Sequence, residues 1–310
     1  MKIRLGHSPD SDDAFMFWGL ASGEVKSEHE FEHILRDIQT LNEWAREGKL
    51  ESSAVSVHAF AYVADKYALL RHGGSFGEGY GPMVVAKRQI PLDELRETKI
   101  AVPGVLTSAF LQLNLWFDDV YGASPVAAMS SPANASPSDP SKATTGRPPG
   151  DHPATPVYGV VPFDQIIPAI QSGEYDAGLI IHEGQLTYEK EGLVEIANMG
   201  KWWAARTGGL PLPLGVNVVR KDLGAAICAD VSRCMRESID AGLNNRDKAL
   251  EYALQFARDM DRETSDEFVG MYVNERTRDM GDDGVRAIRL LLSEGARIGL
   301  VPKVEVEVVD

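Results

Sequence analysis

The chain has 310 residues, enough for about two domains, and its 44% hydrophobic and 25% charged residues are typical of a globular protein. Its formal net charge of -15 at pH 7 disfavours nucleic acid and anionic membrane surfaces as partners, because both would be repelled. A small anionic ligand is still compatible with this charge, since helix N-termini create local positive fields. The sequence has no apolar signal segment and no membrane-spanning run, which predicts a cytoplasmic protein.

The first residues predict a strand, a polar loop and a helix. Residues 3–5 are the strand, and Gly6-His7-Ser8-Pro9 follows it. Asp10, Ser11 and Asp12 carry side chains that cap a helix over residues 14–21. Such a unit is typical of doubly wound α/β proteins. Further along, we expect helices at 38–47 and 59–64 and strands at 53–56 and 67–71.

Residues 73–82 (GGSFGEGYGP) form a glycine-rich loop. The loop leads into a strand at residues 83–86 rather than into a helix, which excludes the dinucleotide-binding fingerprint. No lysine of the phosphate-binding loop type follows it either. We therefore interpret the glycines as a flexible lip or hinge.

A second strand-to-helix unit begins at residue 99. Residues 99–102 predict a strand, and a helix starts near Thr107 and Ser108 and continues to about residue 117. The first amides of a helix have no partner within the helix and attract anions. Thr107 and Ser108 are therefore candidates to hold a carboxylate.

A low-complexity segment divides the chain near its middle. From about residue 123 to 156 it is rich in Ser, Pro, Ala, Thr and Gly, so we expect a mobile insertion without a catalytic role. Regular structure is expected to resume at residue 158, with helices at 163–172, 186–190 and from 201, strands at 193–197 and 216–220, and helices from 225 to 292.

Residues 177–184 (AGLIIHEG) are the most informative stretch of the sequence. Their apolar part predicts a buried strand that ends at His182. Open α/β sheets present functional groups at the carboxyl ends of their strands, and histidine titrates near neutral pH. His182 is therefore the best candidate for acid–base chemistry, and the alternative is a histidine that only packs at a strand end. Glu183 should face the opposite side of the strand and have a structural or loop role.

The order of elements predicts two lobes with two hinge crossings. Connectors near residues 83–92 and 209–216 separate two βα-rich blocks, and the last helices are too many for the second block alone. We expect a discontinuous first lobe of residues 1–86 and 216–310 and a second lobe of residues 87–215. The cleft between them would gather the strand-end residues and bind the ligand. These residues are Ser8 to Asp12, Ser56, Thr107, Ser108 and His182.

Segments along nearly the whole chain resemble the 1,4-dihydroxy-6-naphthoate synthase family of the futalosine route of menaquinone biosynthesis. The stretch from Glu174 through Tyr188 and the motif LPLPLG at 210–215 carry the resemblance most specifically. Only the low-complexity insertion has no counterpart. The other matching segments are Ser8-Pro9 with Asp13-Ala14-Phe15, residues 40–44, Val55-Ser56, residues 79–86, residues 101–104 with Thr107, and Trp202-Trp203.

The resemblance implies an α/β, two-lobed fold of the type II periplasmic-binding-protein kind. It also implies a carbon–carbon lyase that converts cyclic dehypoxanthine futalosine to 1,4-dihydroxy-6-naphthoate and needs no metal or redox cofactor. The partner would be an aromatic carboxylate of low molecular weight, and the oligomeric state is left open. The family's catalytic histidine matches His182, and its ligand-binding positions match Asn42, Ser56, Thr107 and Ser108.

The chain departs from the family in the loop after its first strand. The family usually has Cys-Pro-Asn-Asp-Thr after Ser-Pro, whereas this chain has Asp10-Ser11-Asp12-Asp13-Ala14. The added carboxylates either cap the following helix, which acidic first turns favour, or alter what the cleft accepts. Because this loop should face the cleft, Ser8 and Asp12 join the predicted substrate-binding residues. His7 is a candidate for a second titrating group beside them.

Three other functions fit the same fold. A solute-binding protein without chemistry would explain the lobes but not a base in the cleft. Chorismate dehydratase of the same pathway lacks the segment that carries His182. A divergent lyase for a related polyol-substituted aromatic is the third alternative. A metal at His29 and His33 is not favoured, because the alternating pattern after residue 29 predicts a strand rather than a helix.

Overall fold

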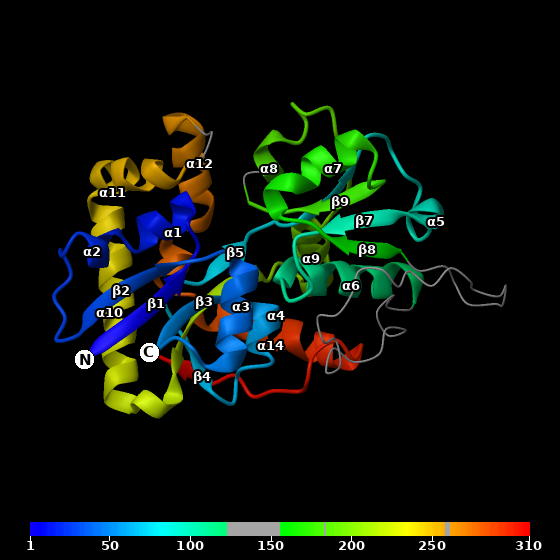
Figure 1. Cartoon of the computed structure of the whole chain (residues 1–310). Coiled ribbons are helices and arrows are strands. Elements are labelled where there is room, and N and C mark those ends of the chain that lie inside the picture. The colour runs from blue at the N-terminus through cyan, green and yellow to red at the C-terminus, as the bar shows by residue number, and fades with distance from the viewer. Residues whose placement is uncertain (123–155, 183, 258–260) are drawn as a thin grey trace.

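The computed structural model describes residues 1–122, 156–182, 184–257 and 261–310, and these form two lobes, each with its own β-sheet (Figure 1). The first sheet has the order β12 (Val308–Val309), β4 (Tyr67–Leu70), β11 (Leu212–Arg220), β3 (Ser52–Ser56), β1 (Lys2–His7), β2 (Glu30–Leu35), and β5 (Ser75–Gly77) also pairs with β11. The second has the order β10 (Val194–Asn198), β6 (Met83–Ala86), β9 (Ala177–Ile180), β7 (Lys99–Val102), β8 (Val157–Val160). Both ends of the chain lie in the first lobe.

Helices cover both sheets (Figure 1). In the first lobe they are α1 (Ser11–Met16), α2 (Trp18–Ala21), α3 (Ile38–Glu47), α4 (Val57–Phe60), α10 (Ala225–Asn244), α11 (Arg246–Ala253), α12 (Arg262–Tyr272), α13 (Glu275–Arg278) and α14 (Gly281–Arg297). In the second lobe they are α5 (Leu92–Leu95), α6 (Ser108–Tyr121), α7 (Ile166–Ser172), α8 (Gly184–Thr187) and α9 (Met199–Thr207). Of the helices in the described ranges, none is both long and apolar enough to cross a membrane.

Parallel strand pairs place polar residues at the edge of each sheet that faces the other lobe. In the first lobe β1 runs parallel to β2 and β3, so the loop after His7 and the end of β3 at Ser56 lie close together. In the second lobe β7 runs parallel to β9, so the loop before α6 lies beside His182. The strand ends therefore collect polar groups, as open α/β sheets do.

The chain passes between the lobes twice, but the expected lobe boundaries need correction. Residues 83–86 were expected in the first lobe, yet β6 pairs with β9 and β10 of the second sheet. The segment 210–215 was expected to be a connector, yet β11 already begins at Leu212 and pairs with β5. Pro213 has no N–H to donate, but its carbonyl accepts a hydrogen bond of 2.7 Å from the Gln112 side chain of α6.

Most other elements were predicted correctly, with local differences. The helix expected at 14–21 is interrupted at Phe17 and forms α1 and α2. The glycine-rich loop 73–82 contains the strand β5, and a Cβ at Gly77 would lie 2.0 Å from the Tyr80 carbonyl oxygen, so close packing requires this glycine. The C-terminal helices are confirmed as α10 to α14. The predicted mobile insertion lies outside the described residues except for Pro156.

The largest hydrophobic core runs through both lobes. It includes Val55 and Phe60 of the first lobe and Leu111 and Trp203 of the second, all fully buried. The Trp203 indole N–H also donates to the Pro211 carbonyl at 3.0 Å, beside the second crossing. The two lobes therefore share a packed core where α6 contacts β11. Residues of both elements also line the pocket between the lobes.

Candidate active site

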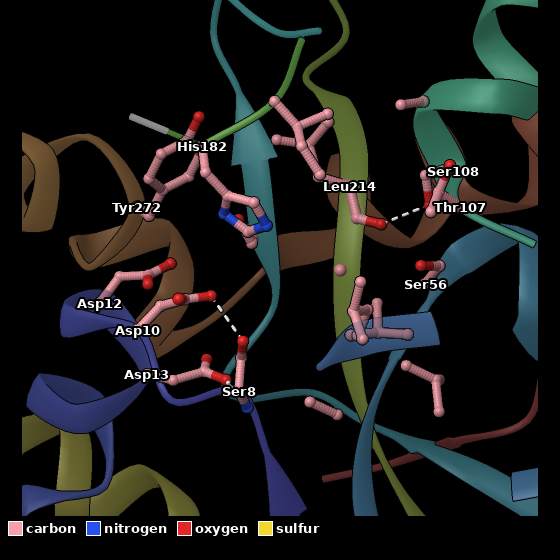
Figure 2. A pocket seen from close by; sticks show the side chains of 18 of the residues that line it. Ser8, Asp10, Asp12, Asp13, Ser56, Thr107, Ser108, His182, Leu214 and Tyr272 are labelled. Atoms are coloured by element: carbon pink, nitrogen blue, oxygen red, sulfur yellow. Dashed lines mark hydrogen bonds between the residues drawn. The ribbon is translucent and has the colours of Figure 1, made fainter. Parts of the chain in front are cut away.

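A pocket lies between the lobes and collects polar groups from both of them (Figure 2). The space between its walls is about 860 Å³, including its opening to solvent. Its polar walls come from the strand ends, and its apolar walls come from β11 and from Met16, Ile38 and Ile181. The predicted residues that line it are Ser8, Asp12, Ser56, Thr107, Ser108 and His182. Asn42, predicted to bind the ligand, is not among its lining residues.

His182 projects into the pocket from the second lobe (Figure 2). The strand β9 ends two residues before it, and the chain then turns sharply. His182 has a φ of 52°, which makes it the one non-glycine residue with positive φ in the described ranges. Such a left-handed conformation is costly and recurs at functional sites, where the surroundings hold it. Here the His182 carbonyl accepts from the Gln185 N–H, and its ring packs at 4.9 Å from the Phe163 ring.

Three carboxylates of the first lobe gather near His182 at what we call the acidic end of the pocket (Ser8, Asp10, Asp12, Asp13) (Figure 2). The Ser8 hydroxyl donates to Asp10, and the Ser8 N–H donates to Asp13 at 2.6 Å. Asp10 precedes α1, but its side chain makes no capping hydrogen bond to that helix. The expected side-chain cap by Asp10 is therefore absent, and Asp10 and Asp13 instead bond to Ser8 beside the pocket.

Burial changes the protonation of this end. Desolvation, together with the charges of Asp13 and Asp10, raises the pKa of Asp12 to about 8, while the nearby His182 opposes the shift. Desolvation likewise raises the pKa of Asp13 to about 7, against the hydrogen bond from the Ser8 N–H. Three like charges so close together cannot all be ionised without a large cost, so the acidic end holds protons near neutral pH.

His7, predicted as a second titrating group, lies beneath this end and not in its wall. It is 4% exposed, with its Nδ1 3.0 Å from the Ser8 carbonyl oxygen and its Nε2 3.0 Å from Nδ1 of His33. Burial and the nearby His33 lower the pKa of His7 to about 3, so it stays neutral and supports the Ser8 loop. The expected strand over His33 is confirmed as β2.

The opposite end of the pocket, which we call the hydroxyl end (Ser56, Thr107, Ser108), holds no carboxylate. Thr107 caps α6, since its side chain accepts from the Phe110 N–H. The Ser108 hydroxyl donates to the Leu214 carbonyl of β11. The backbone amides at Ser108 and Ala109 open α6 and precede the first amide with an acceptor inside the helix.

Asn42 supports the hydroxyl end from behind. It is fully buried in α3, and its side-chain oxygen accepts from the Ser56 N–H at 2.9 Å. Its amide group donates to the Ser56 hydroxyl at 3.1 Å. Asn42 therefore orients Ser56 from behind the pocket wall, whereas the sequence predicted that it binds the ligand directly.

Sequence analysis missed two residues that join the lobes beside His182. Gln185 of α8 donates through its side-chain amide to the Tyr272 hydroxyl of α12 at 2.8 Å, and both line the pocket. No local pattern marks this pair, because it is 87 residues apart in sequence. Glu183, beside His182, lies outside the described residues. Within the described ranges, no group of three His, Cys, Asp or Glu side chains could hold a metal ion.

Comparison with known proteins adds the family. A family profile described as menaquinone biosynthesis matches residues 3–139 and 149–297. The chain belongs to this family. The 1,4-dihydroxy-6-naphthoate synthase of Thermus thermophilus is 37% identical over 298 residues, covering 96% of this chain and 95% of that protein. The enzyme of the same name from Streptomyces coelicolor is 35% identical over 300 residues, covering 97% and 95%.

Solved structures confirm the fold expected of this menaquinone biosynthesis family member. The crystal structure of a protein from Archaeoglobus fulgidus is 38% identical and superposes with a TM-score of 0.82 over 97% of this chain and 98% of that one. The alkanesulfonate-binding protein of Xanthomonas axonopodis, bound to MOPS, has a TM-score of 0.65 at 12% identity over 97% and 94%. The two-lobed, type II periplasmic-binding-protein-like fold is therefore shown, and at this low identity the binding protein carries no further inference.

Proposed function

We propose that the protein is a 1,4-dihydroxy-6-naphthoate synthase, a carbon–carbon lyase that releases this product from cyclic dehypoxanthine futalosine with His182 as its base. The observation that carries the proposal is the position of His182 on the wall of the interlobe pocket, in a chain whose curated relatives bear this name over nearly their full length. A base whose pKa lies near the working pH is the group that such a reaction requires.

The proposed chemistry uses His182 as a neutral imidazole. It removes a proton from a hydroxyl group on the sugar-derived part of the substrate, and the carbon–carbon bond to the bicyclic acid breaks. The electron pair of that bond completes the aromatic ring, which supplies driving force. Proton transfer by a positioned side chain contributes about 10²- to 10⁴-fold to rates of this kind.

The hydroxyl end would hold the carboxylate of the bicyclic acid. The amides of Ser108 and Ala109 open α6, a helix of 14 residues, and a helix start favours negative charge. Ser56, oriented by Asn42, is placed to bond a hydroxyl or carbonyl group of the substrate. The acidic end consists of carboxyl groups and offers no positive field to a carboxylate, so the substrate has one favoured direction in the pocket.

Closure of the lobes would exclude water and bring His182 onto the substrate. We propose that each lobe moves as a unit about the two crossings, with the first lobe ending after β5 and resuming at β11. The Gln185–Tyr272 hydrogen bond spans the lobes next to His182 and fits the closed arrangement.

The test is incubation of the purified protein with cyclic dehypoxanthine futalosine, following the fluorescence of the naphthoate product. The His182→Ala and His182→Asn variants should lose about 10³-fold or more in kcat, since both lack the base. Asparagine tolerates the left-handed conformation, so it separates loss of the base from backbone strain. Calorimetry should show substrate affinity within a few-fold of the wild type.

His29→Asn serves as the matched control, because His29 lies outside the pocket lining and close to Asp230. It should keep its kcat within about two-fold, because the half-buried His29 does not touch the pocket. Turnover that survives in His182→Ala, or a wild-type protein that binds the substrate without forming product, would contradict the proposal.

A further inference from the structure

Asp12 faces the pocket from the first lobe, across from His182 of the second (Figure 2). Its side chain is partly buried, and its Oδ1 atom is shielded from solvent without a hydrogen-bond partner in the described ranges. A buried carboxyl oxygen without a partner costs free energy, so its position calls for an explanation. In a pocket, the simplest explanation is that a bound ligand supplies the missing partner.

Unlike Oδ1 of Asp12, the two neighbouring carboxylates accept hydrogen bonds from Ser8. Asp10 accepts from the Ser8 hydroxyl, and Asp13 accepts from the Ser8 N–H. Both thereby fix the loop between β1 and α1. Asp12 takes part in neither bond and shares its electrostatic environment with His182.

Charged and titratable groups face Asp12 from its own segment, from the second lobe and from α12. Asp10 and Asp13 lie on its own segment, and His182 faces it from the end of β9. Of the helices packed against α1, α12 contributes the Tyr272 hydroxyl to the pocket, whereas α10 and α11 contribute no titratable side chain to its lining. Burial and the two like charges raise the pKa of Asp12 to about 8, so its carboxyl group carries a proton at neutral pH.

We propose that Asp12 is a second catalytic residue, the general acid that complements His182 as the base. This inference rests on the proposed function and adds a group to it. A proton-bearing carboxyl group and an imidazole that face each other across a closing cleft make an acid–base pair that is complete only when the lobes meet.

In the proposed reaction, His182 accepts one proton and Asp12 donates one. His182 takes the proton from the hydroxyl group, whose oxygen becomes the carbonyl oxygen of the departing fragment. The carbon–carbon bond breaks, and its electron pair passes into the ring and onto a ring oxygen. Asp12 delivers its proton to that oxygen, which becomes a hydroxyl group of the product. The proton then passes from the imidazolium of His182 to the Asp12 carboxylate, so both groups are restored without any other reactant.

The test compares the wild type with Asp12→Asn, which has the same shape and no acid proton. The wild-type kcat should fall as the pH rises through about 8, because Asp12 then loses its proton. In Asp12→Asn, kcat at pH 7 should drop about 10²-fold and this alkaline limb should disappear. Substrate affinity measured by calorimetry should stay within about three-fold, because the hydroxyl end is intact.

Asp10→Asn is the matched control at the same end. It removes one of the like charges that raise the pKa of Asp12, so the alkaline limb should persist and move to lower pH. Asp12→Glu, which keeps an acid proton, should keep the alkaline limb and recover part of the lost rate.

Carbon NMR of protein labelled at its aspartate carboxyl carbons gives a readout that is independent of turnover. The carboxyl signal that is present in the wild type and absent from Asp12→Asn should titrate near pH 8. A group that titrates near pH 4 overturns the inference whatever the activity. So does an Asp12→Asn variant that keeps its rate and alkaline limb, or one whose rate and affinity fall together with the limb unchanged. Failure of the proposed function appears separately, as a wild-type protein that forms no product.

Discussion

The two ends of the pocket differ in whether their polar side chains have hydrogen-bond partners within the protein. At the hydroxyl end, the protein itself satisfies the side chains: Ser56 bonds with Asn42, and Ser108 donates to Leu214. At the acidic end, Asp12 has a shielded oxygen without a partner in the described residues, and His182 has a left-handed backbone. At the first end the polar side chains already have partners within the protein, whereas at the second Asp12 has an oxygen that awaits one.

At both ends, however, a buried histidine lies behind the pocket wall and contacts a backbone carbonyl oxygen. Nδ1 of His7 lies 3.0 Å from the Ser8 carbonyl oxygen at the acidic end, and Nδ1 of His58 lies 3.2 Å from the Thr107 carbonyl oxygen at the hydroxyl end. Burial lowers the pKa of His7 to about 3 and that of His58 to about 4, so both stay neutral. The difference therefore lies in the groups that face the ligand: the hydroxyl end should stabilise the fold, whereas the acidic end should cost stability in return for reactivity.

The largest expected loss of stability is at the hydroxyl end. Asn42→Ala removes both hydrogen bonds that Asn42 makes to Ser56, one to its N–H and one to its hydroxyl group. We expect a loss of about 3 kcal/mol in the free energy of unfolding, measured by urea denaturation. Glu43→Ala, on an exposed face of the same helix, should change it by less than about 0.5 kcal/mol. Equal stabilities of these two variants would remove the distinction between the ends.

At the acidic end we expect a substitution to increase the stability of the protein. An unfolded Asp is ionised above about pH 4, whereas folded Asp12 keeps its proton up to about pH 8. Between these values folding takes up a proton, so the contribution of Asp12 becomes more unfavourable as the pH rises and reaches its full size above pH 8. Asp12→Asn should therefore stabilise the protein by an amount that is almost zero at pH 4 and clearly measurable at pH 8.5.

Urea denaturation at both pH values measures this change, and Asp164→Asn, at an exposed position, is the control. The control should leave the free energy of unfolding nearly unchanged at both pH values. If Asp12→Asn destabilised the protein at pH 8.5, the acidic end would contribute to folding as the hydroxyl end does.

Local sequence patterns predicted the residues that stand at strand ends. Ser56 ends a short buried strand, His182 follows another, and Thr107 and Ser108 follow a strand and begin a helix. In an open α/β sheet such positions converge, so their presence in one pocket was predictable without coordinates. The two-lobed fold followed from the order of elements and the resemblance together.

What sequence analysis could not provide depends on contacts between distant segments. The place of Asn42 behind Ser56, outside the pocket lining, results from the packing of α3 on β3. The strand β11 begins at Leu212 because it pairs there with β5, a contact between distant segments that propensity alone does not reveal. Tyr272 reaches the pocket from a helix near the end of the chain, with no local signal.

A smaller loss is expected from the cap of α6. Thr107→Ala removes the oxygen that accepts from the Phe110 N–H, which should cost about 1 kcal/mol of stability. Because the first turn of α6 would fray, KM should rise several-fold while kcat changes little. Thr107→Ser keeps the capping oxygen and should match the wild type in thermal unfolding and in KM. An unchanged KM in Thr107→Ala would show that the substrate carboxylate binds elsewhere.

The smallest effect on stability should come from the link between the lobes at the acidic end. Tyr272→Phe removes the hydroxyl that accepts from Gln185 but keeps the ring, which packs 5.1 Å from the Phe268 ring. We expect a loss of no more than about 1 kcal/mol in unfolding free energy. We also expect a several-fold drop in kcat/KM, because closure beside His182 becomes less favourable. Tyr188→Phe is the matched control, since the Tyr188 hydroxyl bonds only to the exposed Glu189 among the described residues.

A double-mutant cycle with Gln185→Leu separates this link from other roles of the two side chains. If the hydrogen bond itself aids closure, the losses of the single variants in kcat/KM will not add, with a coupling of at least about 0.5 kcal/mol. Additive losses would mean that each residue acts on its own within its lobe. The acidic end would then be assembled without help from this contact, and its cost in stability would come from Asp12 and its neighbours alone.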